Sequence, residues 1–395
     1  MPRSVILAGA RTPIGKLSGA LADLSAMDLG GLAIEAALGL AGVQPDQVDY
    51  VLMGHVLQAG QGQITARQAA VKAGIPMTVP ATTINKVCLS GLNTIFLADQ
   101  MINAGEADIV VAGGMESMTA APYLLPGARA GYRFGDGQLR DAMLLDGLWD
   151  AFDDVAMGGG TERYVQARPD ITRESQDAFA AASHERAAAA IKDGRLGAEI
   201  VPVTVAQRRG RDPLVVDVDE GVRPGTTVES LSRLRPAFSP DGTITAGNAS
   251  QISDGGAAVI VASMAAAERL GIEPLGQVVG YGQVAGPGTS LLSQPARATT
   301  RALERSGLQL SDVDLFELNE AFAAVALASM ADLGLPDDIV NVNGGAIALG
   351  HPIGMSGTRL ALTLLHELRR RGGGLGAAAL CGGGGQGDAL LIRTV

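Results

Sequence analysis

Cys88 stands in the turn of a strand–turn–helix pattern, a setting that favours a reactive thiolate. A β-branched segment that includes Thr82, Thr83 and Ile84 precedes it, and an apolar-periodic segment over 92–104 follows. We therefore expect Cys88 at the N-terminus of a helix. Unpaired N–H groups and the positive end of the helix dipole lower the pKa of a thiol there. Taken alone, such a cysteine is more often an inert core residue, so the case for a nucleophile depends on its partners.

Candidate partners occur in three further segments, each where we expect a strand to end. His351 lies between glycine and proline, in a loop that presents an imidazole rather than a core side chain. Asn319 follows an apolar strand, where its amide can serve catalysis or cap the helix expected over 321–330. Cys381 opens a run of glycines whose N–H groups could form an oxyanion site. Functional groups of α/β folds gather at strand ends, so we expect one shared pocket.

The elements that must position these residues follow an α/β order. In the first 120 residues we predict strands over 5–8, 48–54, 81–85 and 109–113 and helices over 27–41, 65–73 and 89–104. This alternation implies a mostly parallel sheet covered on both faces. The last third repeats the first: Ser90-Gly91 and Ser356-Gly357 each open a helix that leads to an apolar strand running into glycines. Two related halves are the simplest account of this repeat.

An insertion of different amino-acid composition separates the two halves. Residues 123–141 are rich in Gly, Pro and Arg and indicate a long exposed loop. A helix that Thr172 caps and Gly194 ends comes next. Positive charge gathers beyond it, where a solvated surface is the default interpretation for most of the arginines: Arg208, Arg209, Arg211, Arg223, Arg233 and Arg235.

Composition narrows the class of protein. A chain of 395 residues is expected to form two or three domains. Its net charge of −11 argues against nucleic-acid or anionic-membrane partners. Two cysteines exclude a disulfide scaffold and a cysteine-based zinc cluster. The chain enters a strand almost at once and has no apolar run of transmembrane length, so we expect a soluble, cytoplasmic protein without a signal peptide.

The four chemistry-bearing segments resemble, in kind and order, the signature blocks of the thiolase family, and the resemblance extends along essentially the whole chain. Cys381 resembles thiolases more than ketoacyl synthases, which use histidine or asparagine there. The resemblance implies an α/β thiolase fold, in which two βαβαβαββ halves form a layered α-β-α-β-α core with an inserted loop domain. It places the first half at 1–120 plus 253–274, the insertion at 121–252 and the second half at 275–395.

The resemblance implies acetyl-CoA C-acetyltransferase activity, the reversible Claisen condensation of two acetyl-CoA to acetoacetyl-CoA and CoA through an acyl-cysteine. Cys88 would be the nucleophile, His351 would accept its proton, and Cys381 would deprotonate the second acetyl-CoA. His351 and, through a water, Asn319 would stabilise the enolate. The N–H groups of Cys88 and Gly383 would hold the tetrahedral oxyanion. No metal or redox cofactor is implied.

The resemblance also assigns CoA contacts, chiefly in the insertion: Leu148, Met157, Arg223, Ser230, Leu234, Phe238, Ala246 and Ser250. Arginines there would attract the phosphates of CoA to an acidic protein. Residues 123–137 resemble the tetramerisation loop of short-chain thiolases, which implies a homotetramer. Two departures bear on chain length: Ala156 replaces the histidine of His-Met-Gly, and 291–296 replaces a Met-Gly-x-Gly-Pro stretch.

Three alternatives stay open at this stage. A degradative 3-ketoacyl-CoA thiolase would accept longer acyl chains. A redox protein would form a reversible disulfide between Cys88 and Cys381, although no local Cys-x-x-Cys supports this. The third alternative is a scaffold or acyl-binding protein without catalysis. It would not explain why Cys88, Asn319, His351 and Cys381 occur together.

Overall fold

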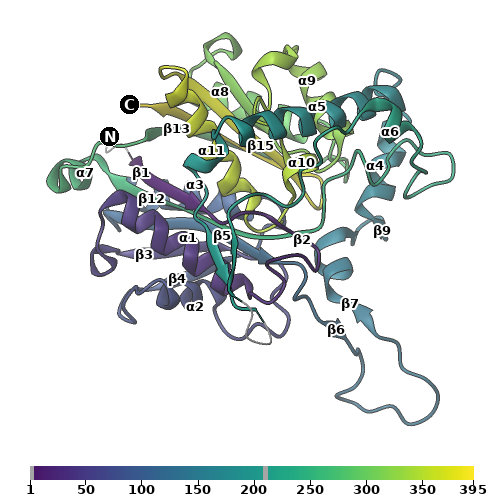
Figure 1. Ribbon diagram of the computed structural model, residues 1–395, viewed down its shortest axis with the longest axis horizontal. Helices are drawn as coiled ribbons and strands as arrows, with labels where there is room; N and C mark the ends of the chain where they lie inside the picture. The colour runs from purple at the N-terminus through teal and green to yellow at the C-terminus, as the bar shows by residue number, and fades with distance from the viewer. Residues whose placement is uncertain (1–3, 208–211) are drawn as a thin grey trace.

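The strands of the computed structural model, which describes residues 4–207 and 212–395, form one large mixed sheet (Figure 1). Their order is β14-β15-β16-β13-β1-β12-β5-β3-β4, and a short β2 (Gly15–Lys16) also pairs with β12. The first half supplies β1 (Ser4–Arg11), β3 (Tyr50–Gly54), β4 (Ala81–Ile84), β5 (Ile109–Ser117) and β12 (Ser253–Ser263). The second half supplies β13 (Gly276–Ala285), β14 (Leu315–Leu318), β15 (Leu375–Gly382) and β16 (Gln386–Thr394).

The parallel arrangement predicted for the first 120 residues is confirmed: β3 pairs parallel with β4 and β5, and β1 runs in the same direction because it and β5 are both antiparallel to β12. The complete sheet is mixed, and in the second half the named strands that pair parallel are β14 and β15. The other neighbours along the sheet pair antiparallel, because β12 enters from the insertion and β15 turns directly into β16 without a crossover helix. Within the sheet, the two halves meet where β1 pairs with β13. Val5 pairs there with Gln277, and Ile6 pairs with Gly276.

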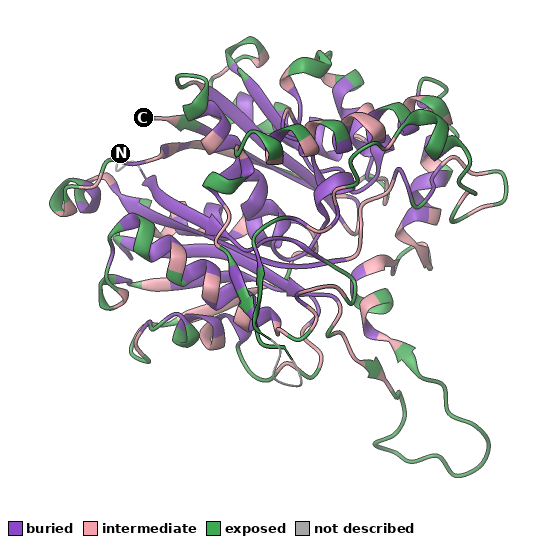
Figure 2. Ribbon diagram, in the orientation of Figure 1, coloured by how far each residue is buried: buried purple, intermediate pink, exposed green. Residues whose placement is uncertain are grey.

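Helices divide and cover this sheet in layers, as the resemblance implied. In the middle, α3 (Ser90–Asn103) packs against α11 (Ser356–Arg370), and both contact strands of both halves. One outer face carries α1 (Ala26–Ala41) and α2 (Thr65–Lys72). The other carries α8 (Gln294–Ser306), α9 (Ala323–Leu333) and α5 (Arg173–Lys192). α11 is buried along most of its length, and the strands of the sheet on which it packs are buried as well, which Figure 2 shows in purple.

A buried ion pair accompanies the central position of α11. The Arg359 side chain is 1% exposed, and its Nη1 lies 2.9 Å from Oε2 of Glu317 on β14. Burial raises the pKa of Glu317, and the Arg359 guanidinium opposes this shift by stabilising the carboxylate with which it pairs. A charged residue on the inner face of a helix needs such a partner, because an unpaired buried charge is strongly destabilising.

The two halves share their element order with one difference. The first half reads β1-α1-β3-α2-β4-α3-β5-β12, and the second reads β13-α8-β14-α9-α11-β15-β16 with the short α10 (Ala346–Leu349) before α11. Where β4 would have its counterpart, the described residues show only a single bridge between Phe316 and Val340. The chain beyond that bridge is the segment 344–354 that carries His351.

The insertion supplies short elements and a long projecting loop. Its elements are β6 (Tyr123–Leu124), β7 (Arg140–Asp141), a π-helical turn (Leu144–Leu148), β8 (Trp149–Asp150), β9 (Val155–Ala156), α4 (Met157–Val165), α5, β10 (Val203–Val205), β11 (Leu214–Val216) and α6 (Val228–Ser232). The loop between β6 and β7 extends away from the body (Figure 1) and is exposed, as predicted. Thr172 caps α5 as predicted, by accepting a hydrogen bond from the Ser175 N–H.

Arg208, Arg209 and Arg211 lie outside the described residues. Of the helices that the structure describes, none is both long enough and apolar enough to cross a bilayer.

Between β12 and β13 lies α7 (Met264–Leu270), which Ser263 caps.

Candidate active site

Cys88 lies in the turn between β4 and α3, as the sequence predicts. The turn is held from within: the Ser90 hydroxyl donates to the Val87 carbonyl (2.6 Å) and accepts from the Lys86 N–H (2.8 Å). Val87 has a φ of 51°, in the left-handed region that a β-branched residue rarely adopts. This backbone conformation aims the next residue, Cys88, at a cavity, and strained residues of this kind cluster at functional sites.

The prediction of a lowered thiol pKa at Cys88 is wrong for the protein without substrate. Burial raises its pKa to about 12, and the negative charge of Glu116 adds to the shift. The Cys88 N–H opposes these effects, but one hydrogen bond does not outweigh desolvation. Cys88 is therefore a neutral thiol at rest and requires a base to become a nucleophile.

His351 is held in the tautomer that can act as that base. Its Nδ1 lies 2.6 Å from the Ser356 hydroxyl, which donates its only proton to the Pro352 carbonyl at 2.9 Å. The hydroxyl must then accept a hydrogen bond, so Nδ1 carries the proton and Nε2 keeps its lone pair. Burial lowers the pKa of His351 to about 3, aided by the positive charge of Arg359. The result is a neutral imidazole whose Nε2 can accept a hydrogen bond or a proton.

Asn319 faces His351 rather than capping a helix. Its Nδ2 lies 3.4 Å from His351 Nε2, and its Oδ1 is buried without a hydrogen-bond partner among the described residues. The capping role considered from the sequence is wrong: α9 begins at Ala323, and its N-cap residue is Phe322. The Asn319 side chain is fully buried, so its unpaired carbonyl oxygen is free to bind a polar atom in the site.

Cys381 is the last residue but one of β15 and is 1% exposed. Burial raises the pKa of its thiol well above the ordinary range, and the negative charge of a Cys88 thiolate raises it further. Gly384 (φ 74°) and Gly385 (φ 64°) then turn the chain back into β16. Since both φ values lie in the left-handed region, glycine suits this hairpin, and the bare backbone beside Cys381 stays accessible.

These segments meet in one cavity of about 60 Å³. Four of the five predicted catalytic residues line it: Cys88, His351, Cys381 and Gly383. Asn319 lies behind His351. Three of the predicted CoA contacts, Leu148, Met157 and Ser250, also line the cavity, together with sequence neighbours that were not predicted: Val87, Gly147, Leu291, Ala321, Phe322, Ile353 and Gly382.

The other predicted CoA contacts line two separate cavities. Arg223, Ser230, Leu234 and Ala246 border one of about 200 Å³, which also includes His184. Phe238 borders another of about 410 Å³, and its ring packs edge-on against Phe322 with centroids 6.2 Å apart. Phe322 lines the cysteine cavity, so this ring contact joins the two regions. The structure thus separates the predicted contacts into an inner and an outer group.

Glu116, at the end of β5, is a site residue that the sequence reasoning missed. Its carboxylate accepts hydrogen bonds from the N–H groups of Val56 (3.1 Å), Leu57 (3.1 Å) and Gly354 (2.9 Å), and His55 Nε2 lies 3.3 Å away. It therefore ties the loop that carries His351 to the wall against which Cys88 packs. The sequence contained a signal for Glu116, because a polar side chain at the end of an apolar strand is the pattern that identified Asn319.

Glu320 and Ser356 were also missed. Glu320 is fully buried and accepts hydrogen bonds from Ser183, Asn341 and the Ile347 N–H, so it fixes the base of the segment that leads to His351. Ser356 fixes the orientation of the His351 imidazole, and its position five residues after His351 gave no sign of this in the sequence.

Among the described residues, no group of three or more His, Cys, Asp or Glu side chains is placed to hold a metal ion.

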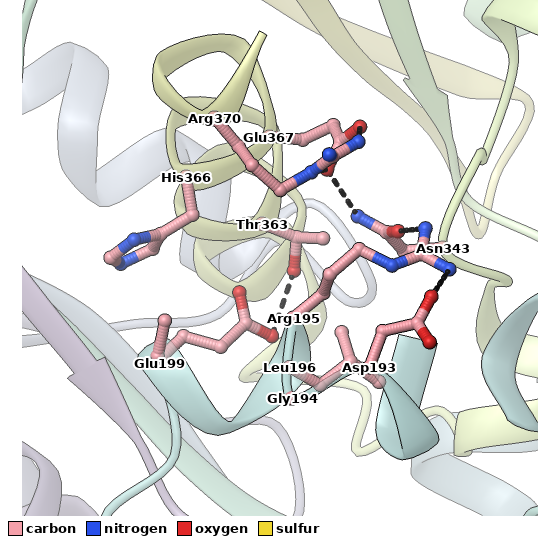
Figure 3. Close-up of a pocket in the computed structure, with 11 residues that line it drawn as sticks. Asp193, Gly194, Arg195, Leu196, Glu199, Asn343, Thr363, His366, Glu367 and Arg370 are labelled. Carbon is pink, nitrogen blue, oxygen red and sulfur yellow. Dashed lines mark hydrogen bonds and ion pairs between the residues drawn. The ribbon is translucent and has the colours of Figure 1, made fainter. Parts of the chain in front are cut away.

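A further cavity of about 240 Å³ lies between the C-terminal ends of α5 and α11 (Figure 3). Its charged groups are paired: Arg195 with Asp193, Arg370 with Glu367, and Glu199 with Arg11 outside the cavity. No cysteine lines it, but His366 does, and its Nε2 is buried without a hydrogen-bond partner among the described residues.

Comparison with known proteins identifies the family to which this fold and this site belong. Models of the thiolase N-terminal and C-terminal domains match residues 4–265 and 272–394, and the chain belongs to the thiolase family. A probable acetyl-CoA acetyltransferase of Mycobacterium tuberculosis is 57% identical over 397 residues, covering 100% of both chains. The acetyl-CoA acetyltransferase of Cupriavidus necator is 52% identical over 389 residues, covering 98% of each. The crystal structure of the Bacillus anthracis acetyl-CoA acetyltransferase matches with a TM-score of 0.97 at 41% identity, covering 100% of this chain and 99% of that one. The predicted family and fold class are confirmed.

Proposed function

We propose that this protein is an acetyl-CoA C-acetyltransferase that converts two acetyl-CoA reversibly into acetoacetyl-CoA and CoA. One observation carries the proposal: Cys88, His351 and Cys381 come from distant segments and line one small cavity. Relatives named acetyl-CoA acetyltransferase that are 52% to 57% identical across nearly the whole chain support the same reaction.

In the first half-reaction, Cys88 takes the acetyl group. Nε2 of His351 accepts the thiol proton as the sulfur attacks the thioester carbonyl, and the N–H groups of Cys88 and Gly383 hold the oxyanion. When the tetrahedral intermediate collapses, the carbon–sulfur bond to CoA breaks and His351 returns the proton to the leaving thiolate. The resting state of this site, a neutral thiol beside a neutral imidazole, has the protons where this step needs them.

In the second half-reaction, Cys381 acts as the base. His351, which is neutral again, takes the thiol proton of Cys381, and the resulting thiolate removes a proton from C2 of a second acetyl-CoA. The enolate then attacks the acetyl carbonyl on Cys88. The bond between that carbonyl and the Cys88 sulfur breaks, and the Cys88 thiolate takes the proton from His351. While Cys88 is acylated it cannot become a thiolate, so the negative charge that would raise the pKa of Cys381 further is absent when Cys381 has to ionise. Asn319 supports the enolate through a water, for which its unpaired Oδ1 is suited.

The size of the cavity favours acetyl over longer acyl groups. Its volume of about 60 Å³ is far below the ~300–1,000 Å³ of pockets for drug-sized ligands. Leu148, Met157, Leu291 and Phe322 close it with apolar side chains. Of the two departures from the family pattern, Ala156 borders the Phe238 cavity, whereas Leu291 of the 291–296 stretch lines the acyl cavity. A degradative thiolase for long chains is the weaker candidate for this reason.

The wider proposal covers CoA binding, assembly and location. Leu148, Met157 and Ser250 contact the thioester end of CoA, and Arg223, Ser230, Leu234, Phe238 and Ala246 bind the rest of it. Leu234 and Phe238 are 38% and 42% exposed, so a bound ligand could cover their apolar side chains.

The exposed Tyr123, Tyr132 and Phe134 support assembly into a homotetramer through the 123–137 loop. We place the protein in the cytoplasm, with domains at 1–120 plus 253–274, 121–252 and 275–395, and the reaction balances without a metal or redox cofactor.

Intact-protein mass after brief incubation with acetyl-CoA tests the proposal. Wild type should gain one acetyl group, Cys88→Ala none, and Cys381→Ala should keep the adduct but make no acetoacetyl-CoA. Thiolysis of acetoacetyl-CoA should be more efficient than thiolysis of C8–C16 3-ketoacyl-CoA. An adduct on Cys88→Ala, or no adduct on folded wild type, would refute the acetyl-enzyme. A preference for long chains would favour the degradative enzyme.

A further inference from the structure

The turn that carries Cys88 packs directly on the hairpin that carries Cys381. A Cβ placed on Gly382 would lie 2.5 Å from Cγ of Leu89, closer than side chains pack. A Cβ on Gly383 would lie 3.5 Å from Val87. Two segments almost 300 positions apart therefore approach with bare backbone between them, and their relative placement fixes the separation of the two sulfurs.

One ion pair joins these two segments at their edge. Nζ of Lys86 lies 2.7 Å from Oδ1 and 2.9 Å from Oδ2 of Asp388. Lys86 precedes Cys88 by two residues, and Asp388 lies opposite Leu380 in the β15–β16 ladder, next to the pair that Cys381 forms with Gly387. The pair thus links the nucleophile turn of one half to the hairpin of the other.

Asp388 is held in place by burial and by further hydrogen bonds. It is fully buried, and burial raises the pKa of its carboxyl while Lys86 opposes the shift. Hydrogen bonds with Gln283 on β13 and Asn93 on α3 also act on this carboxyl. Lys86 is fixed at its other end, because its N–H donates to Ser90 Oγ within the turn.

Stability alone is a poor reason for such a pair. Removing two charges from water costs much of the energy that their attraction returns, and apolar residues of similar volume are often as stabilising. A geometric role is better supported, because a single ammonium contacts both carboxylate oxygens across the join between two catalytic segments.

We propose that Lys86 and Asp388 are positioning residues that set the separation of Cys88 and Cys381 for the condensation step. This inference rests on the proposed function. Acylation needs Cys88 and His351, whereas condensation also needs Cys381 within reach of the substrate that attacks the acyl-Cys88. Loss of the pair should therefore affect the second half-reaction far more than the first.

The test compares Lys86→Met/Asp388→Asn, which removes both charges together, with Lys86→Arg, which keeps an ion pair. Lys72→Met/Asp28→Asn is the matched control, because that pair has the same 2.7 Å contact but lies on α1 and α2, away from the site. Acetylation of Cys88 is followed by intact mass, and condensation by acetoacetyl-CoA formation. We expect acetylation within about threefold of wild type and condensation lowered by roughly 30- to 100-fold, since a misplacement of 1 Å can cost ~100-fold. Lys86→Arg should recover part of the loss.

A second readout reports the separation of the sulfurs without catalysis. Phenylarsine oxide bridges two neighbouring thiols, and Cys88 and Cys381 are the only cysteines of the chain. Bridging should be weaker in the double variant, while the unfolding temperature stays close to that of the control.

Three outcomes overturn the inference: unchanged condensation, equal loss of both half-reactions, or unchanged bridging by the arsenical. Wild-type protein that gains no acetyl group would instead refute the proposed function, and it is measured first.

Discussion

Replacing Ser356 by alanine should slow acylation by changing the tautomer of His351. Ser356 is 1% exposed and holds the Nδ1 proton of His351 through a 2.6 Å contact. In Ser356→Ala that proton has no partner, and an unsatisfied buried donor costs about 1–3 kcal/mol. The imidazole then favours a proton on Nε2, the nitrogen that must accept the thiol proton of Cys88.

The same penalty sets the expected rate loss. At about 1.4 kcal/mol for each factor of ten, 1–3 kcal/mol corresponds to a loss of roughly 5- to 150-fold. The loss should fall on acylation of Cys88, because that step transfers a proton to Nε2. Binding of acetyl-CoA should change little, since Ser356 does not line the cavity.

Quenched-flow mass spectrometry of the acetyl-enzyme measures this rate. Ser263→Ala is the matched control: its hydroxyl also makes two hydrogen bonds, to Asp108 and from the Ala266 N–H, but it caps α7 far from the site. That variant should lose about 0.5–2 kcal/mol of stability and keep its acylation rate. An acylation rate in folded Ser356→Ala within twofold of wild type would show that the tautomer argument is wrong.

Two further predictions follow from pKa shifts. In Glu116→Gln, loss of the negative charge that raises the pKa of Cys88 should move the pH profile of iodoacetamide alkylation to lower pH, even though turnover falls; an unmoved profile would mean that this charge does not act on Cys88. Burial alone would raise the pKa of Glu367, but hydrogen bonds from Arg370 and Arg371 lower it from 4.5 to about 2. Because the unfolded state binds the extra proton first, the free energy of unfolding should fall as pH drops from 4.5 towards 2, and urea titrations of Glu367→Gln should show a weaker decline.

The predicted catalytic residues that line one cavity stand beside glycine or a small polar residue, a pattern that depends on neighbours in sequence. Cys88 follows a strand, as expected, and Cys381 lies next to the last residue of one, but the strand expected before His351 is absent from the described residues, where α10 precedes it. Short-range patterns of this kind also placed α1, α2 and α3 to within a residue or so. The helix dipole was inferred from the same pattern, but its effect on the Cys88 pKa was outweighed.

The incorrect or missing predictions concern long-range interactions. The pKa of Cys88 depends on burial by segments such as the Ile353 loop, which are remote in sequence. The antiparallel pairing of β1 with β12 depends on a strand that follows the insertion, and the periodicity of neither strand indicates direction. The role of Lys86 depends on Asp388, 302 positions away. Such contacts are properties of the folded chain, and a local pattern does not specify them.

The packing of α3 against α11 at the centre of the molecule has a consequence for how this chain can be divided. Each helix begins at a catalytic segment, α3 just after Cys88 and α11 just after His351, so the reactive groups face each other across the join between the halves. A fragment that ends before β13 would keep the proposed nucleophile and lose both proposed bases. A fragment that starts there would keep the bases without the thiol that the first of them activates. On the proposed mechanism, neither piece is active alone, and two separately produced fragments should regain activity only when they associate.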